Sequence, residues 1–174
     1  PSEHPFVYGF EVIASSGYVT VMSDMIGFGA TKDMDQYYYN QKTHSKVAID
    51  LLKAGEEFLK EKDILLSDQL FLFGYSQGGF ITLSTHKELE EQAVYDKEIT
   101  AVAAGAGSYN IEFVMHDVIE RGVFASPAFL SLMVYSYNSV NGFDNPMDYY
   151  FKEPFASQIP ELLNGSKNAN AEWC

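Results

Sequence analysis

The chain has 174 residues, of which 47% are hydrophobic and 20% charged, a composition typical of one globular domain and not of a disordered segment. Its formal net charge of −13 disfavours nucleic-acid binding, because an acidic surface repels phosphate groups. The single cysteine, Cys174, excludes an internal disulfide and a cysteine-based zinc site, and the scattered histidines form no metal-binding pair. We therefore expect no metal. No apolar run is long enough to cross a membrane, so we expect no transmembrane segment.

Helical and strand patterns alternate along the first part of the chain. A helix over residues 6–16 would end at Gly17 as its C-terminal cap, and the following β-rich stretch leads into a tight turn marked by Gly27 and Gly29. The next helix has Thr43 available as its N-cap. Helices are expected over residues 6–16, 43–62 and 78–91, and strands over residues 18–22, 70–73 and 99–104. The alternation predicts an α/β fold, a parallel sheet with helices on both faces.

The pattern changes after Gly105. Residues 109–174 are rich in Phe, Tyr and Met and are interrupted by prolines, with two possible helices over residues 111–121 and 127–137. We interpret residues 1–108 as a partial sheet-bearing core and residues 109–174 as a helical, aromatic-rich lid or cap that follows the third strand.

A candidate nucleophile follows the strand at residues 70–73, in the stretch Gly74-Tyr75-Ser76-Gln77-Gly78-Gly79. Gly-x-Ser-x-Gly also occurs by chance, but here an apolar strand enters it and an amphipathic helix leaves it, which is the setting of a nucleophile elbow. The strained serine requires small residues two positions away, which Gly74 and Gly78 supply. The turn places the Gln77 N–H at a helix N-terminus, where it can stabilise an oxyanion. The alternative is a glycine-rich turn with an idle serine.

Together with Ser16 to Asp24 and Gly27 to Ala30, this elbow resembles the α/β-hydrolase superfamily, and within it the secretory-lipase-like esterases. The resemblance covers about residues 1–110 and matches the central portion of such an enzyme. It implies hydrolysis of a small-molecule carboxylic ester or lipid through an acyl-enzyme on Ser76, with no cofactor and with a secreted or periplasmic location. Acyl transfer or peptidase chemistry on the same elbow remains an alternative, as does a non-catalytic binding module of this fold.

The resemblance also implies parts that the chain lacks. Such enzymes take their second oxyanion donor from a loop after an earlier strand, and their acid and histidine from strands after the lid. We expect these parts, and the rest of the sheet, in a segment not shown here or in a second chain.

None of the four histidines is a credible base for Ser76. His4 lies near the terminus, and His86 lies about two turns along the helix that starts beside Ser76, where it is expected on the helix surface. His44 is expected to cap its helix or to be exposed. His116 is the best placed, but the Ser–acid–His order of the superfamily makes a surface position on a lid helix its default interpretation.

Three further residues have candidate roles. Asp24 follows a strand, and the resemblance implies that it supports the turn after it by accepting hydrogen bonds from backbone N–H groups. Tyr75 and Tyr109 are candidates to line an acyl pocket, although aromatic residues at such positions more often serve as core or lid packing.

Overall fold

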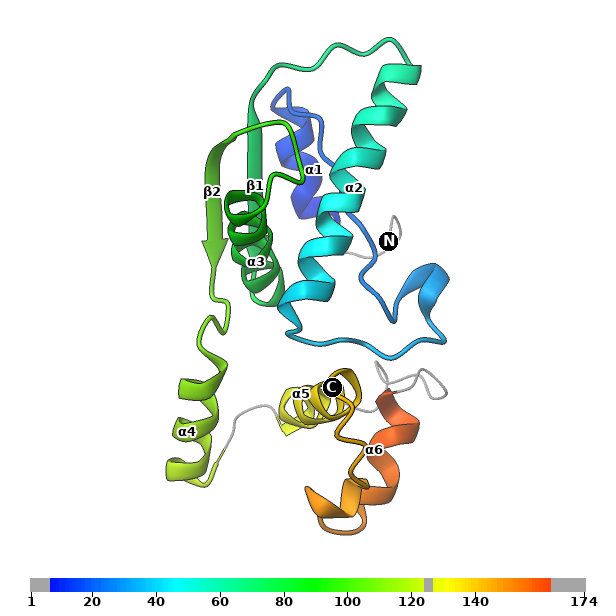
Figure 1. Cartoon of the computed structure of the whole chain (residues 1–174), viewed down its shortest axis with the longest axis vertical. Coiled ribbons are helices and arrows are strands. Elements are labelled where there is room, and N and C mark those ends of the chain that lie inside the picture. Colours follow the sequence, from blue (N-terminus) through cyan, green and yellow to red (C-terminus); the bar gives the residue numbers. More distant parts are fainter. Residues whose placement is uncertain (1–6, 124–126, 164–174) are drawn as a thin grey trace.

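The computed structural model describes residues 7–123 and 127–163 (Figure 1). In chain order the elements are α1 (Val7–Ser15), η1 (Gly29–Thr31), α2 (Gln41–Glu61), β1 (Leu70–Tyr75), α3 (Gln77–Glu91), β2 (Ile99–Gly105), α4 (Ile111–Arg121), α5 (Pro127–Val140), η2 (Met147–Tyr149) and α6 (Phe155–Leu163). In this described part, no helix is both long and apolar enough to span a membrane.

The two strands β1 and β2 pair in parallel, as predicted, and α3 connects them. Their register runs from Leu70 opposite Ile99 to Tyr75 opposite Gly105, with one irregularity after Leu70. The carboxyl ends of both strands therefore meet at Tyr75 and Gly105. This is the edge of a parallel sheet at which ligands usually bind.

The expected strand at residues 18–22 is wrong for the described residues, because the sheet there has only the two strands β1 and β2. The stretch does pass close to the sheet, since the ring of Tyr18 lies edge-on to that of Phe71 with centroids 5.5 Å apart. Its Val and Thr residues favour a strand, but a strand also needs a neighbour that satisfies its backbone hydrogen bonds. Propensity alone could not show that this neighbour is missing.

Helix α3 packs against both strands and against α2. Helix α2 begins at Gln41, two residues earlier than expected, because the side chain of Asn40 caps it by accepting a hydrogen bond from the Thr43 N–H at 3.0 Å. Thr43 is thus inside the first turn and is not the cap. On β1, Phe71, Phe73 and Tyr75 alternate with the more buried residues and are exposed on the face of the sheet opposite α3.

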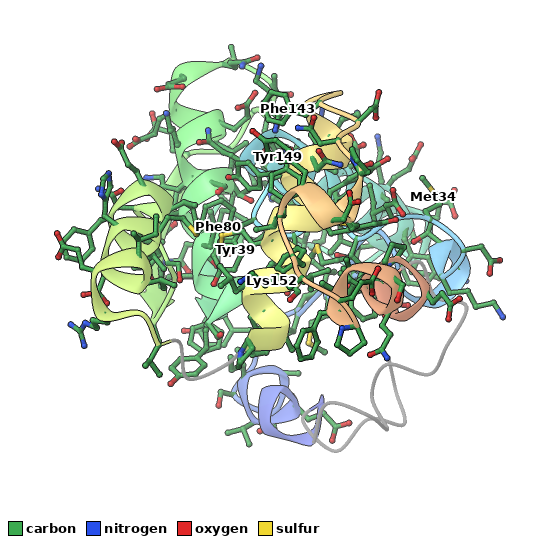
Figure 2. All side chains as sticks on the ribbon, turned by 90° about the horizontal axis from the view of Figure 1, so that it is seen from below. Met34, Tyr39, Phe80, Phe143, Tyr149 and Lys152 are labelled. Atoms are coloured by element: carbon green, nitrogen blue, oxygen red, sulfur yellow. The ribbon has the colours of Figure 1, made fainter. Side chains whose placement is uncertain are left out.

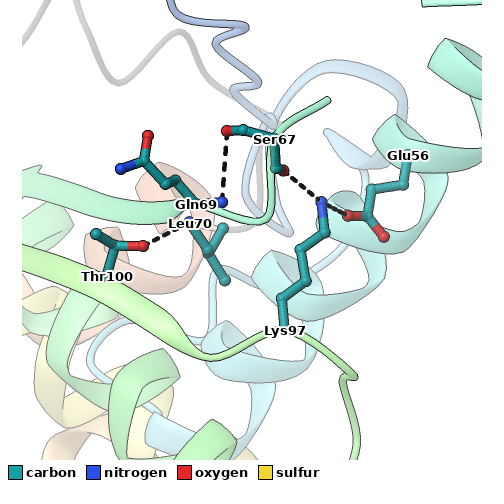
Figure 3. A network of polar contacts seen from close by, with 6 residues as sticks. All are labelled: Glu56, Ser67, Gln69, Leu70, Lys97 and Thr100. Carbon is teal, nitrogen blue, oxygen red and sulfur yellow. Dashed lines mark hydrogen bonds and ion pairs between the residues drawn. The ribbon is translucent and has the colours of Figure 1, made fainter. Parts of the chain in front are cut away.

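A polar network fixes the other end of the sheet, far from the carboxyl edge (Figure 3). Lys97 Nζ donates to Glu56 Oε1 at 2.7 Å and to the Ser67 carbonyl at 3.3 Å, which links the end of α2 to the approaches of both strands. The Leu70 N–H donates to Thr100 Oγ1 at 3.1 Å and holds the first residues of the strands together. The network holds the beginning of β1 beside the beginning of β2, at the end of the sheet opposite Tyr75 and Gly105.

Helices α4 to α6 lie beyond the carboxyl ends of the strands, toward which the β2 arrow points (Figure 1). We call residues 109–163 the cap segment; its separation from residues 1–108 as a distinct domain stays a prediction. A buried apolar cluster joins it to the core, with Tyr39 and Phe80 near the centre of the view from the cap side (Figure 2). The members of this cluster are Tyr38, Tyr39, Phe80, Ile81, Leu132, Met133, Ile159 and Leu163.

Hydrogen bonds also tie α5 to the loop before α2. Asp35 accepts from Tyr135 Oη and from Ser139 Oγ, each at 3.0 Å. Burial, and then the bond to Asp35, raise the pKa of the Tyr135 phenol to about 12. Two further hydroxyls of α5 donate to the carbonyls of Tyr38 and Tyr39 at 3.2 Å. Helix α5 is therefore anchored to the core over residues about a hundred positions away in sequence.

Candidate active site

Ser76 forms the turn between β1 and α3 and has φ 56° and ψ −123°. A positive φ is strained for a residue with a side chain, and this is the strain that the Gly-x-Ser-x-Gly pattern predicts. The turn is held by two hydrogen bonds: the Ser76 N–H donates to the Gly105 carbonyl at 2.8 Å, and the Phe80 N–H donates to the Ser76 carbonyl at 3.2 Å. The residue is exposed, and no described residue hydrogen-bonds its Oγ. The hydroxyl is thus presented at the carboxyl edge of the sheet.

The glycines around Ser76 differ in what they permit. A Cβ at Gly74 would collide with the backbone of Gly78 and with Thr82 Oγ1, so this position needs glycine. A Cβ at Gly79 would collide with the Gly105 carbonyl, and glycine there lets α3 approach β2 closely, as expected. At Gly78 no described atom outside its own helix and its chain neighbours lies within 4 Å of the Cβ position, so the need for a small residue there stays a prediction.

The Gln77 N–H lies at the start of α3, where an N–H has no acceptor within its own helix. The helix dipole adds partial positive charge at this end, which favours an anion beside it. A substrate oxygen that gains negative charge next to Ser76 would meet this donor. The geometry suits an oxyanion donor, and that role for Gln77 stays a prediction.

Both candidate pocket tyrosines lie at the carboxyl edge. The Tyr75 side chain is 69% exposed, and its Cδ2 lies 3.1 Å from the Cβ position of Gly105. The Tyr109 side chain follows β2 and lies against the first turn of α3, with its Oη 3.1 Å from the Cβ position of Gly79. The structure brings both side chains close to the elbow, while their function as an acyl pocket stays a prediction.

None of the described histidines hydrogen-bonds Ser76. His86 lies on the surface of α3, as expected, with its Nε2 3.1 Å from Glu90 Oε1. His116 is exposed on α4, beside a shallow groove whose other lining residues are Asn110, Glu112, Phe113, Asp117 and Glu120. His4 lies outside the described residues, as does Cys174. The base for Ser76 is therefore not supplied by the described part of the chain.

His44 was expected to cap its helix or to be exposed, and this was wrong. Its side chain lies in the first turn of α2 and is only 1% exposed, and neither ring nitrogen has a hydrogen-bond partner among the described residues. Burial lowers the pKa of its imidazole to about 4. The nearby backbone of Tyr37 raises the pKa in part, although it makes no hydrogen bond to the ring. His44 lies on α2, which packs against α3, and a local sequence pattern does not show such packing.

The turn after residue 22 is tight, as Gly27 and Gly29 predicted, with φ of 88° and 54°. The expected role of Asp24 is wrong in detail: no described backbone N–H donates to its carboxylate. The carboxylate packs where a Cβ of Gly29 would lie, and Thr31 Oγ1 closes the turn by accepting from the Gly27 N–H at 3.1 Å. Asp24 thus fills the space that a side chain at position 29 would occupy, so this position needs glycine.

No protein-family model matches the chain, and no curated protein sequence matches it. Solved structures do. A candidate hydrolase from Legionella pneumophila is 31% identical, with a TM-score of 0.80 over 90% of this chain and 42% of its own. The N228W mutant of the rice cell wall degrading esterase LipA from Xanthomonas oryzae is 27% identical, with a TM-score of 0.73 over 89% of this chain and 42% of its own.

The LipA structure without that substitution aligns with a TM-score of 0.79 at 22% identity, over 92% of this chain and 46% of its own. The chain thus spans less than half the length of each of these structures. The parallel sheet, the elbow and the likeness to these structures agree with one another. By sequence and structure, the chain therefore has an α/β-hydrolase-type fold and is similar to hydrolases and esterases of that fold.

Proposed function

We propose that the chain carries the nucleophile of a serine carboxylic-ester hydrolase, with Ser76 as the attacking residue. The observation that carries this proposal is the strained, exposed serine between β1 and α3. The likeness to esterase structures supports the reaction class. A small-molecule ester or lipid is the proposed substrate.

In the proposed reaction, Ser76 Oγ attacks the carbonyl carbon of the ester, and its proton passes to a general base. The carbonyl oxygen gains negative charge and accepts a hydrogen bond from the Gln77 N–H at the start of α3. The tetrahedral intermediate collapses, the bond to the alcohol oxygen breaks, and the alcohol leaves with the proton. Water then attacks the acyl-enzyme, which releases the acid and restores Ser76.

The base, the acid that orients it and the second oxyanion donor are proposed to lie in polypeptide beyond these residues or in a second chain. Two observations support this. Phe71 and Tyr75 are exposed on a sheet face that a folded protein would normally cover. The similar solved structures are more than twice as long as the part that the chain matches. A secreted or periplasmic location is also proposed, and cell fractionation would test it.

Hydrolysis of p-nitrophenyl esters of graded acyl length by the intact protein tests the proposal, with Ser76→Ala as the variant and Ser67→Ala, far from the elbow, as the control. We expect Ser76→Ala to abolish hydrolysis and Ser67→Ala to retain it. The dependence on acyl length would show whether short esters or lipids are preferred. Full activity in Ser76→Ala would exclude this serine as the nucleophile. Transfer of the acyl group to an alcohol, or cleavage of peptides, would instead favour acyltransferase or peptidase chemistry on the same elbow.

A further inference from the structure

The loop at the end of β2, residues 105–109, contacts the elbow through a hydrogen bond and close packing. The Gly105 carbonyl, at the end of β2, accepts the Ser76 N–H at 2.8 Å. The same carbonyl contacts Gly79 so closely that a Cβ there would collide with it. Ala106 follows with φ 54°, and the Tyr109 N–H donates to the Gly107 carbonyl at 3.0 Å. The path of residues 105–109 is therefore fixed relative to Ser76.

This loop places the ring of Tyr109 in a slot that two glycines leave open. A Cβ at Gly107 would lie 2.5 Å from Tyr109 Cε1 and 2.9 Å from its Cζ, so any larger residue at 107 would displace the ring. On the other side, Tyr109 Oη lies 3.1 Å from the Cβ position of Gly79. Gly79 lies three residues, about one helical turn, after Ser76, so the Tyr109 phenol lies beside the first turn of α3.

The Tyr109 side chain is also partly open to solvent. The side chain is 46% exposed, and no described residue hydrogen-bonds its Oη. A fixed tyrosine supplies one O–H donor at the same edge of the sheet as the Gln77 N–H. Packing requires only the ring of this residue. The hydroxyl is therefore the group that distinguishes a packing role from a binding role.

We propose that Tyr109 contacts the substrate at the Ser76 site and donates a hydrogen bond from Oη to an oxygen of the bound ester. This rests on the proposed esterase function and goes beyond an apolar pocket lining. It predicts that the site favours esters that offer an oxygen beside the first turn of α3 over compounds that offer only alkyl groups there.

Tyr109→Phe tests the proposal in the intact protein, because it keeps the ring in its slot and removes only the hydroxyl. We expect kcat/KM for p-nitrophenyl butyrate, and the rate of Ser76 labelling by a fluorophosphonate, each to fall about tenfold. Thermal unfolding should stay at the parent temperature. The control is Tyr149→Phe in the cap segment, a tyrosine 73% exposed, which should retain the parent rates.

Parent-like rates in Tyr109→Phe, in a protein that Ser76→Ala inactivates, would overturn the role of Tyr109 and leave the esterase proposal standing. A fall equal to that in Tyr149→Phe would overturn it in the same way. A parent protein that neither hydrolyses esters nor reacts with the fluorophosphonate would overturn both proposals. A lowered unfolding temperature in Tyr109→Phe together with lost activity would show that the hydroxyl acts in folding and not on substrate.

Discussion

Replacing His44 with glutamine should flatten the dependence of stability on pH. The imidazole is 1% exposed, and burial lowers its pKa from 6.5 to about 4. Between those pH values the unfolded chain binds a proton at this residue and the folded chain does not. The contribution of the neutral His44 ring to the free energy of unfolding is therefore fully present above about pH 6.5, and it is lost as the pH falls toward 4.

The size of the effect follows from the two pKa values. A change from 6.5 to about 4 corresponds to about 3 kcal/mol, since one pKa unit is worth about 1.4 kcal/mol. The free energy of unfolding of the parent should thus fall by about 3 kcal/mol more than that of His44→Gln between pH 7 and pH 4. Other titrating groups contribute to both proteins and cancel in the difference.

Urea unfolding at a series of pH values measures this difference. The matched control is His86→Gln, which removes a partly exposed imidazole paired with Glu90 on the surface of α3. A steeper loss in the parent than in His44→Gln, well beyond its difference from His86→Gln, is the expected result. Curves of the same shape for the two variants would refute the reasoning from burial. An NMR titration of the His44 ring gives the pKa directly if the glutamine variant folds poorly.

Two further changes test the packing around the site. Gly74→Ala should destabilise the protein by about 3 kcal/mol or more and abolish hydrolysis, because the added Cβ would collide with backbone atoms. Gly78→Ala, where the described residues leave open space, should keep both stability and activity. Equal losses of stability for the two variants in urea unfolding would contradict this difference. Asp35→Asn should weaken the two hydrogen bonds that Asp35 accepts from α5, at a cost of about 2 kcal/mol, and the amides of α5 should then exchange hydrogen faster. The control is Asp33→Asn, at an exposed aspartate. Unchanged exchange in Asp35→Asn would show that other contacts hold the cap segment.

Local sequence patterns predicted the elements around Ser76 well. The strand at β1, the helix α3 and the strand β2 all lie within two residues of their expected ranges. Each has a continuous apolar run or a 3.6-residue rhythm, and the positions of Gly74 and Gly79 follow from the turn itself. The elbow is a local structure, so its residues are neighbours in the sequence and its geometry can be inferred from them.

The features that the sequence did not reveal depend on distant contacts. Helix α6 was missed because Pro160 lies inside it, although Ala156, Ile159 and Leu163 recur at helical spacing and are buried. That spacing was the signal that could have found it. The hydrogen bond from the Ser76 N–H to the Gly105 carbonyl joins the turn after β1 to the end of β2, and no local sequence pattern near either residue predicts it.

The most direct test of the central claim is reaction of the intact protein with a fluorophosphonate, followed by mass spectrometry of its peptides. The elbow geometry predicts one phosphonylated residue, Ser76, and loss of the label in Ser76→Ala. A label on another serine, or no label on a protein that hydrolyses esters, would contradict the assignment of Ser76. No label and no hydrolysis would instead identify the chain as part of a non-catalytic module with a hydrolase-type fold.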